Sequence, residues 1–171
     1  MTNQNIRVLP LGGLGGIGKN CTVIEYGEDL LVIDAGMEFP SDEMLGVDVV
    51  IPDFTYLVER QDHILGIVIT HGHEDHIGGL PYLLQQISAP VYATALTRGL
   101  IEVKLTSEQK KRVRLQTIAP GWTLTLGPFV VTPFHVNHSI PDAVGLAIRT
   151  PAGLVVHTGD FKIDHTPIEG D

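Results

Sequence analysis

The sequence predicts an α+β fold in which sheet layers are covered by helices. Apolar segments typical of short strands dominate the first third of the chain, and segments with helical spacing occupy the middle. Beyond residue 115 the pattern returns to strands. No repeat or flexible linker interrupts this order, and 171 residues are enough for one domain with a substantial core. We therefore expect a single domain over residues 1–171.

The N-terminal region is predicted to form three strands and a long loop. β-Branched and aromatic residues indicate strands at 6–11, 20–26 and 30–35. The turn-like sequence Gly27-Glu28-Asp29 joins the last two strands into a hairpin. Residues 37–54 contain prolines and several acidic residues and indicate a loop, after which 56–60 adds a helical turn.

The middle of the chain begins with the apolar run ILGIVIT at 64–70, which is typical of a strand buried on both faces. Helices are predicted at 80–87, where Pro81 fits the first turn, and at 96–105. A strand at 90–95 lies between them. Further strands are predicted at 116–120, 122–127, 129–136, 143–150 and 154–160.

The glycine-rich segment LGGLGGIGKN, residues 11–20, contains two overlapping nucleotide-binding patterns. Gly13, Gly15 and Gly18 spell G-x-G-x-x-G, and residues 13–19 also read G-x-x-x-x-G-K. Both motifs bind phosphate at the N-terminus of a helix. The residues after Asn20 predict a strand instead, so a turn that lets backbones approach closely is favoured over nucleotide binding.

The composition limits the classes of function. No window holds the roughly 18 uninterrupted apolar residues of a membrane helix, and the N-terminus has no secretory pattern, so we expect a soluble, cytoplasmic protein without a membrane partner. Cys21 is the only cysteine, which excludes an internal disulfide, and it is expected to be a small buried hydrophobe. The net charge of −9 argues against bulk electrostatic binding of nucleic acid, but not against a nuclease whose metals reverse the local charge.

One cluster of basic residues has two interpretations. It falls around a predicted helix end and consists of Lys104, Lys110, Lys111, Arg112 and Arg114. A solvated polar face is favoured over a dedicated RNA contact, because runs of charge usually only solvate a surface.

The segment THGHEDHIGG, residues 70–79, predicts a metal site. It places H-x-H-x-D-H at the end of a buried strand, with ligand candidates His71, His73, Asp75 and His76. In extended backbone His71 and His73 project to the same side and can converge on one cation, while Asp75 and His76 can face a neighbouring one. Imidazole and carboxylate suit zinc, or manganese where oxygen ligands dominate. The glycines of this segment indicate a tight ligand loop rather than a plain helix start.

This motif resembles the signature of the metallo-β-lactamase superfamily, and the chain is similar in particular to its ribonuclease J branch, which belongs to the β-CASP nucleases. The resemblance rests on the segments LGGLGGIGKN, LLVIDAG, GVDVVIPDF, THGHEDHIGG, HSIPDAVG and HTGDFKID. It implies an αββα sandwich, of which residues 1–171 would be the N-terminal portion. The glycine-rich segment would then join the first strands without binding a nucleotide.

The resemblance implies a site with two divalent metal ions, expected to be Zn²⁺, with Mn²⁺ or Mg²⁺ as alternatives. His71, His73 and His138 match the ligands of the first metal. Asp160 matches the aspartate that bridges both metals, and Asp75 with His76 matches most of the second site. Asp75 and Asp160 are therefore the expected catalytic residues, with Asp75 orienting a hydroxide held between the metals.

Three further residues carry open interpretations. Asp34, at the end of LLVIDAG, matches an aspartate that supports the metal loop through hydrogen bonds, although it could instead cap a turn. His135 and His157 are either donors to the ligands or structural histidines, and the structural interpretation is favoured because the ligand positions are already filled. His63 and His165 are expected in loops.

The resemblance implies a metal-dependent ribonuclease with 5′-to-3′ exonuclease and endonuclease activity in RNA maturation and decay, with RNA as its partner and a dimeric or tetrameric parent protein. The β-CASP insert, the returning half of the metal domain, the C-terminal region and one distant histidine ligand are not in this sequence. We therefore expect these 171 residues alone not to degrade RNA processively. The alternatives are a small-molecule hydrolase of the same superfamily, acting on a lactam, lactone or thioester, and an inactive metal-binding module.

Overall fold

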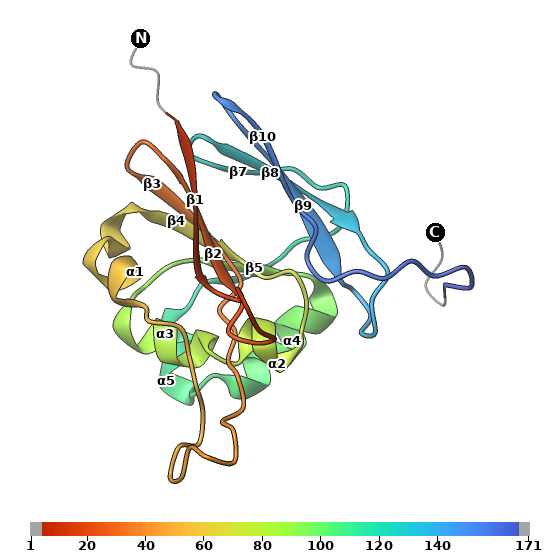
Figure 1. Cartoon of the computed structure of the whole chain (residues 1–171). Helices are drawn as coiled ribbons and strands as arrows, with labels where there is room; N and C mark the ends of the chain where they lie inside the picture. The colour runs from red at the N-terminus through yellow and green to blue at the C-terminus, as the bar shows by residue number, and fades with distance from the viewer. Residues whose placement is uncertain (1–4, 168–171) are drawn as a thin grey trace.

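The computed structural model describes residues 5–167 and shows two stacked sheets with helices on one outer face (Figure 1). The larger sheet has the strand order β1-β2-β3-β4-β5-β6, and the smaller one has the order β10-β9-β8-β7. The predicted α+β class is confirmed, because the helices alternate with strands only in the first sheet and the second sheet is all antiparallel.

The larger sheet changes from antiparallel to parallel pairing at its centre. Its strands are β1 (Ile6–Gly12), β2 (Cys21–Tyr26), β3 (Asp29–Ile33), β4 (Ile64–Val68), β5 (Val91–Ala93) and β6 (Leu115–Thr117). The first three pair antiparallel through short connections, whereas β3, β4, β5 and β6 pair parallel. Parallel pairing brings the carboxyl ends of β3 and β4 to the same edge. The metal motif follows β4 at that edge.

Helices and the loop at 37–54 make the connections between the parallel strands. The helical segments are α1 (Thr55–Glu59), the short 3₁₀ helix η1 (Gln61–His63), α2 (Glu74–Ile77), α3 (Leu80–Gln86), α4 (Ala95–Lys104) and α5 (Ser107–Arg112). The loop carries one isolated bridge, between Glu38 and Val50. Within residues 5–167, no helix is both long and apolar enough to cross a membrane.

Two local predictions were wrong. Residues 74–77 form the single helical turn α2 instead of an irregular ligand loop. Helix α5 was also missed, although a capping box between Thr106 and Gln109 begins it. Its last turn holds the basic side chains Lys110, Lys111 and Arg112, where positive charge is favourable at a helix C-terminus. Lys104 forms an ion pair with Glu74. Four of the five basic residues thus have a place in the helical layer, which agrees with the favoured interpretation of the cluster as a polar face.

The smaller sheet is an antiparallel meander that covers the opposite face of the larger sheet. Its strands are β7 (Leu124–Leu126), β8 (Phe129–His135), β9 (Val144–Thr150) and β10 (Gly153–His157). The outer face of this sheet is open, since Leu154 and Val156 are 54% and 55% exposed. In residues 5–167 the αββα arrangement is therefore present as one helical layer and two sheets.

Two apolar layers meet on either side of the central strands. On β3, Leu30 and Val32 pack toward the helices, while Leu31 and Ile33 pack toward the smaller sheet. All four side chains are fully buried, and burying each one contributes about 1.5–3 kcal/mol. Cys21 is buried in the helix-side layer, as expected for a small hydrophobe. This packing fixes the carboxyl ends of β3 and β4 as a rigid platform.

Candidate metal centre

Two buried polar residues lie on this platform, just beyond the ends of β3 and β4. Asp34 follows β3, and Thr70 lies just beyond β4. The Thr70 backbone N–H donates to Asp34 Oδ1 at 2.8 Å, and the Thr70 hydroxyl donates to Asp34 Oδ2 at 2.9 Å. Both residues are buried, so these bonds hold the start of the metal motif against the neighbouring strand.

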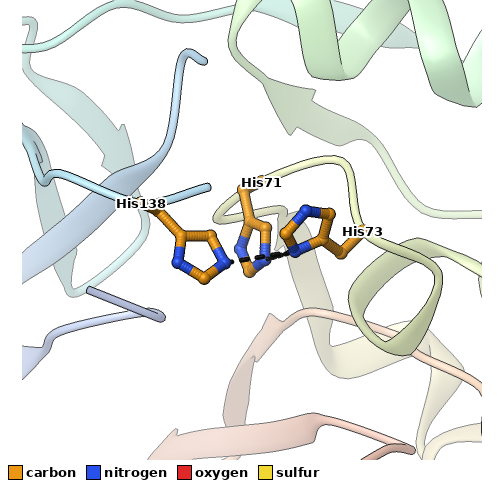
Figure 2. A group of neighbouring side chains, drawn as sticks. All are labelled: His71, His73 and His138. Atoms are coloured by element: carbon orange, nitrogen blue, oxygen red, sulfur yellow. Dashed lines mark hydrogen bonds between the residues drawn. The ribbon is translucent and has the colours of Figure 1, made fainter. Parts of the chain in front are cut away.

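Three imidazole rings form the first ligand group (Figure 2). His71 Nε2 lies 3.0 Å from His73 Nδ1, and His138 Nε2 lies 3.1 Å from the same atom. In a tetrahedral zinc site, ligand nitrogens about 2.0–2.1 Å from the metal are about 3.3 Å apart. The three nitrogens converge at nearly this spacing, and the donor set therefore fits a divalent ion.

Two histidines of this group, His71 and His138, have lowered pKa values, which favour the neutral form that binds metal. Burial, followed by the nearby His76, lowers the pKa of His71 to about 4. Burial and then His73 also lower the pKa of His138. The Thr70 hydroxyl donates its hydrogen to Asp34. Its oxygen therefore accepts a hydrogen bond from His71 Nδ1, which lies 3.0 Å away. This bond leaves the lone pair of His71 Nε2 directed into the site.

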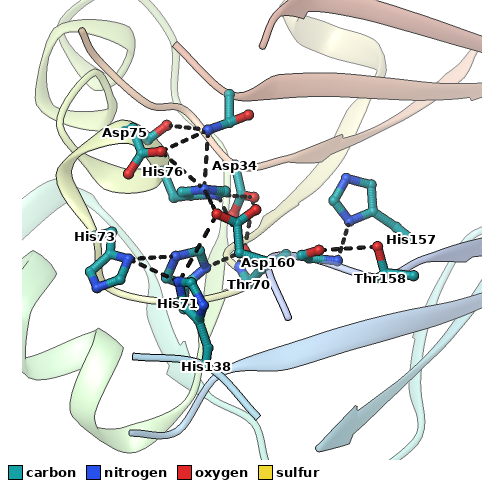
Figure 3. Close-up of polar contacts among 12 residues, drawn as sticks. Asp34, Thr70, His71, His73, Asp75, His76, His138, His157, Thr158 and Asp160 are labelled. Atoms are coloured by element: carbon teal, nitrogen blue, oxygen red, sulfur yellow. Dashed lines mark hydrogen bonds and ion pairs between the residues drawn. The ribbon is translucent and has the colours of Figure 1, made fainter. Parts of the chain in front are cut away.

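A second ligand group shares His71 and adds His76 and Asp160, with all its ligand atoms within 4.8 Å of one another (Figure 3). Asp160 Oδ2 lies 3.5 Å from His76 Nε2 and 4.0 Å from His138 Nε2. This carboxylate therefore faces both groups. Its place supports the bridging role that the resemblance implied for Asp160.

Asp75 lies at the rim of the second group, on the single turn of α2. Its Oδ2 atom is 3.5 Å from His76 Nε2, and about a quarter of its side chain is exposed. A Cβ atom on Gly36 would lie 1.6 Å from the Asp75 backbone oxygen, so only glycine allows the end of β3 to approach α2 this closely.

Asp34 and His76 form a buried pair behind the second group. Burial lowers the pKa of His76, but the carboxylates of Asp34 and Asp75 outweigh it and raise this pKa to about 10. Burial by itself would raise the pKa of Asp34. The nearby His76 and the hydrogen bonds from Thr70 outweigh this effect, and the net result is a lowered pKa for Asp34. Asp34 adopts a φ of 62°, in the left-handed region. Its contacts support the predicted role of holding the metal loop rather than only capping a turn.

Sequence reasoning missed two residues of this site. Thr70 and Asn20 both contact ligands, and the only sequence signal was a polar residue directly after an apolar run or a glycine-rich turn. His157 Nδ1 accepts from the Gly159 backbone N–H at 3.1 Å and so braces the turn before Asp160. His135 Nε2 lies 3.4 Å from Asn137 Oδ1, a contact outside both ligand groups, in agreement with a structural role.

Two cavities flank the ligand groups. One of about 250 Å³ lies beside His76 and Asp160 and is bounded by the glycine-rich turn. Another of about 190 Å³ lies beside His138 and is bounded by Ile140 and Lys162. The glycine-rich turn leads directly into β2, so it presents no helix N-terminus to a phosphate. Each cavity borders at least one candidate ligand.

Comparison with known proteins agrees with this geometry. Residues 14–169 match the family model described as the metallo-beta-lactamase superfamily. The chain belongs to the metallo-β-lactamase superfamily. The fold of this superfamily member is also similar to that of the metallo-beta-lactamase fold protein YhfI from Bacillus subtilis, with a TM-score of 0.68, 22% identity, and coverage of 91% of this chain and 62% of that one.

Curated relatives of this superfamily member carry the name ribonuclease J. The chain is 51% identical over 171 residues to ribonuclease J of Synechocystis sp. strain PCC 6803, covering 98% of this chain and 27% of that protein. It is 47% identical over 170 residues to ribonuclease J of Helicobacter pylori strain 26695, covering 98% and 25%. The chain thus spans about a quarter of the length of these relatives. The predicted resemblance to the ribonuclease J branch is confirmed.

Proposed function

We propose that this chain carries the metal centre of a ribonuclease that hydrolyses RNA phosphodiester bonds. The observation that carries the proposal is the convergence of the His71 and His138 nitrogens on His73 Nδ1, at 3.0 and 3.1 Å, with Asp160 facing both ligand groups. The relatives named ribonuclease J, at 47–51% identity, support RNA as the substrate. The 5′-to-3′ exonuclease and endonuclease activities are part of the same proposal for the longer protein.

The proposed cofactors are two divalent metal ions. His71, His73 and His138 would hold the first, whose all-nitrogen donor set favours Zn²⁺. His76, Asp75 and Asp160 would hold the second, where the larger share of oxygen donors also suits Mn²⁺ or Mg²⁺. When bound, such ions supply Lewis acidity and lower the pKa of water, which provides a nucleophile at neutral pH.

The chain's own residues would prepare the site for in-line attack on phosphorus. The Asp75 carboxylate, at the rim of the second group, is placed to accept a hydrogen from the attacking water and so to orient it. Asp34 fixes the ring of His76, and Thr70 fixes the ring of His71. His76 and His71 are thereby each held by a partner that lies outside the candidate metal site.

We further propose a cytoplasmic protein that acts as a dimer or tetramer in its full-length form, and we assign residues 1–171 to one metallo-β-lactamase domain. The buried thiol of Cys21 supports a reducing compartment, because the sequence has no second cysteine with which to form an internal disulfide. The ribonuclease relatives support RNA as the partner.

The experiment that tests the function compares three substrates on the purified chain with Zn²⁺ or Mn²⁺. We expect metal-dependent hydrolysis of the phosphodiester bis(p-nitrophenyl) phosphate, faster than hydrolysis of nitrocefin or of a thioester, and its loss in His73→Ala. A 5′-monophosphorylated, end-labelled RNA is expected not to be degraded processively by these 171 residues. Faster turnover of nitrocefin or the thioester would favour the small-molecule hydrolase, and no metal-dependent turnover of any substrate would favour the inactive module.

A further inference from the structure

We propose that Asn20, the last residue of the glycine-rich segment, is a positioning residue that holds Asp75 in place beside His76 for the second metal ion. The inference deepens the proposed function, since it takes Asp75, His76 and Asp160 as ligands of that ion. It also gives the glycine-rich segment a role other than nucleotide binding.

The side-chain amide of Asn20 contacts the second ligand group directly. Its Nδ2 atom lies 3.1 Å from Asp75 Oδ2 and 3.1 Å from His76 Nε2. Asp75 Oδ2 and His76 Nε2 lie 3.5 Å apart, and His76 Nε2 also lies 3.5 Å from Asp160 Oδ2, so the amide borders the space that the second ion would occupy. The ion would take the single lone pair of His76 Nε2, and the amide would keep its contacts with Asp75. Metal sites typically depend on such outer contacts for ligand orientation.

The backbone of Asn20 is fixed on both sides, so its amide has a defined position. The Asn20 N–H donates to the Asp75 backbone oxygen at 3.0 Å, and the Asn20 carbonyl accepts from the Gly36 N–H at 2.9 Å. Asn20 Nδ2 also lies 3.1 Å from the Asp75 backbone oxygen. Asn20 is thus bound between the end of β3 and the turn of α2, the two elements that carry Asp34 and the ligands.

The glycine-rich turn folds onto this amide. A Cβ atom at Gly13 would lie 2.5 Å from Asn20 Oδ1, and Gly13 has a φ of +82°. Gly15 has nearly the same backbone, with a φ of +76°, but a Cβ there would meet nothing within 4 Å. Gly13 therefore leaves the space that the Asn20 amide needs, whereas Gly15 serves the backbone of the turn alone. The two glycines form a matched pair for an experiment.

The test measures binding of the second ion separately from the first. The chain is loaded with one equivalent of Zn²⁺, which is silent in electron paramagnetic resonance and binds such nitrogen sites more tightly than Mn²⁺. Mn²⁺ is then added to millimolar concentration, and its free signal is recorded for the unsubstituted protein, Asn20→Ala, Gly13→Ala and Gly15→Ala. Retained Zn²⁺ is measured by mass spectrometry, and the fold is checked by circular dichroism and thermal melting.

We expect Asn20→Ala to bind Mn²⁺ about 10–100-fold more weakly, the usual effect of removing an outer contact, while Zn²⁺ content stays unchanged. Gly13→Ala should show the same defect and Gly15→Ala should not, even if both melt at equally reduced temperatures. If these residues served folding alone, the loss of Mn²⁺ affinity would instead parallel the loss of melting temperature in each variant. If Asn20→Ala fails to fold, the comparison of Gly13→Ala with Gly15→Ala decides.

Three results would overturn the inference. The first is an unchanged Mn²⁺ affinity in Asn20→Ala, and the second is an equal loss of affinity in Gly13→Ala and Gly15→Ala. The third is an unsubstituted protein that keeps its Zn²⁺ but takes up no Mn²⁺ at millimolar concentration. Failure of the proposed function is distinguishable, because it appears as phosphodiester hydrolysis that is absent or that does not depend on His73.

Discussion

His76 Nδ1 lies 2.8 Å from Asp34 Oδ2, and both side chains are only 2% exposed. This contact joins the residue that follows β3 to a candidate ligand on α2, 42 positions later in the chain. The candidate metal centre is therefore not a property of the H-x-H-x-D-H segment alone. It depends on a neighbouring strand that supplies the fixed acceptor for His76.

Replacing Asp34 with Asn should weaken metal binding while the ligands themselves remain. The amide cannot supply the negative charge that holds the His76 ring, so we expect about a 10–100-fold loss of affinity for the second ion. Isothermal titration with Zn²⁺ or Mn²⁺ measures this change. Asp62→Asn, at an exposed site in η1, is the matched control. Equal affinities in the two variants would contradict the role given to Asp34.

Replacing His73 with Ala should remove the first ion. His73 Nδ1 is the atom that both His71 and His138 face, so its loss leaves two imidazoles instead of three. Metal content after dialysis, measured by plasma mass spectrometry, should fall by about one equivalent per chain. His165→Ala removes an exposed histidine outside the site and should leave the metal content unchanged. A normal content in His73→Ala would exclude the three-histidine site.

The carboxylate of Glu25 should make stability depend on pH, away from the metal centre. Burial raises the pKa of Glu25, but the Tyr56 hydroxyl and the Arg60 and Arg7 guanidinium groups outweigh it and hold this pKa below its usual value of 4.5. A lowered pKa in the folded state stabilises the protein above pH 4.5, and this contribution is lost as the pH falls through the folded-state value.

Urea denaturation of Glu25→Gln measures that contribution. At pH 7 the variant should lose about 1–3 kcal/mol of unfolding free energy, because the buried Glu25 side chain loses the charge that accepts from Tyr56, Arg60 and Arg7. The difference from the unsubstituted protein should shrink as the pH is lowered below 4.5. Glu28→Gln, at an exposed position, should change stability by no more than about 0.5 kcal/mol at either pH. A pH-independent difference would refute this account of Glu25.

Two leucines should report the difference between the inner and outer faces of the sheets. Leu31 is fully buried between the two sheets, and Leu31→Ala should cost about 2–5 kcal/mol of unfolding free energy. Leu154, on the open face of β10, is 54% exposed, so Leu154→Ala should cost about 0.5 kcal/mol or less. Similar losses in both variants would mean that the outer face is covered in solution.

The sequence predicted the strands and the larger helices because their apolar periodicity is local. The run at 64–70 is the clearest case, since β4 is buried on both faces as its composition indicated. Helix α5 was missed because its basic residues resemble a loop, although Thr106 and Gln109 spell a capping box. Short helices have too few apolar positions for periodicity to reveal them.

The candidate site was predictable only in part, because some of its residues are close in the chain and others are far apart. His71 and His73 are two residues apart, so their convergence follows from strand geometry. His138 and Asp160 could be assigned only from the resemblance, because no spacing rule joins residues that lie far apart in the chain. Asn20 and Thr70 were missed because their partners, Asp75 and Asp34, are 55 and 36 positions away.

All the candidate metal ligands lie on the C-terminal side of the loop at 37–54. Leu45, near its tip, is 91% exposed and accessible to a protease, while the bridge between Glu38 and Val50 closes its base. Cleavage at Leu45 would give one piece with β1–β3, Asn20 and Asp34, and another with every candidate metal ligand. The pairing of β3 with β4 would hold the two pieces together. Metal uptake could then be used to follow the reassembly of the two halves as separate chains.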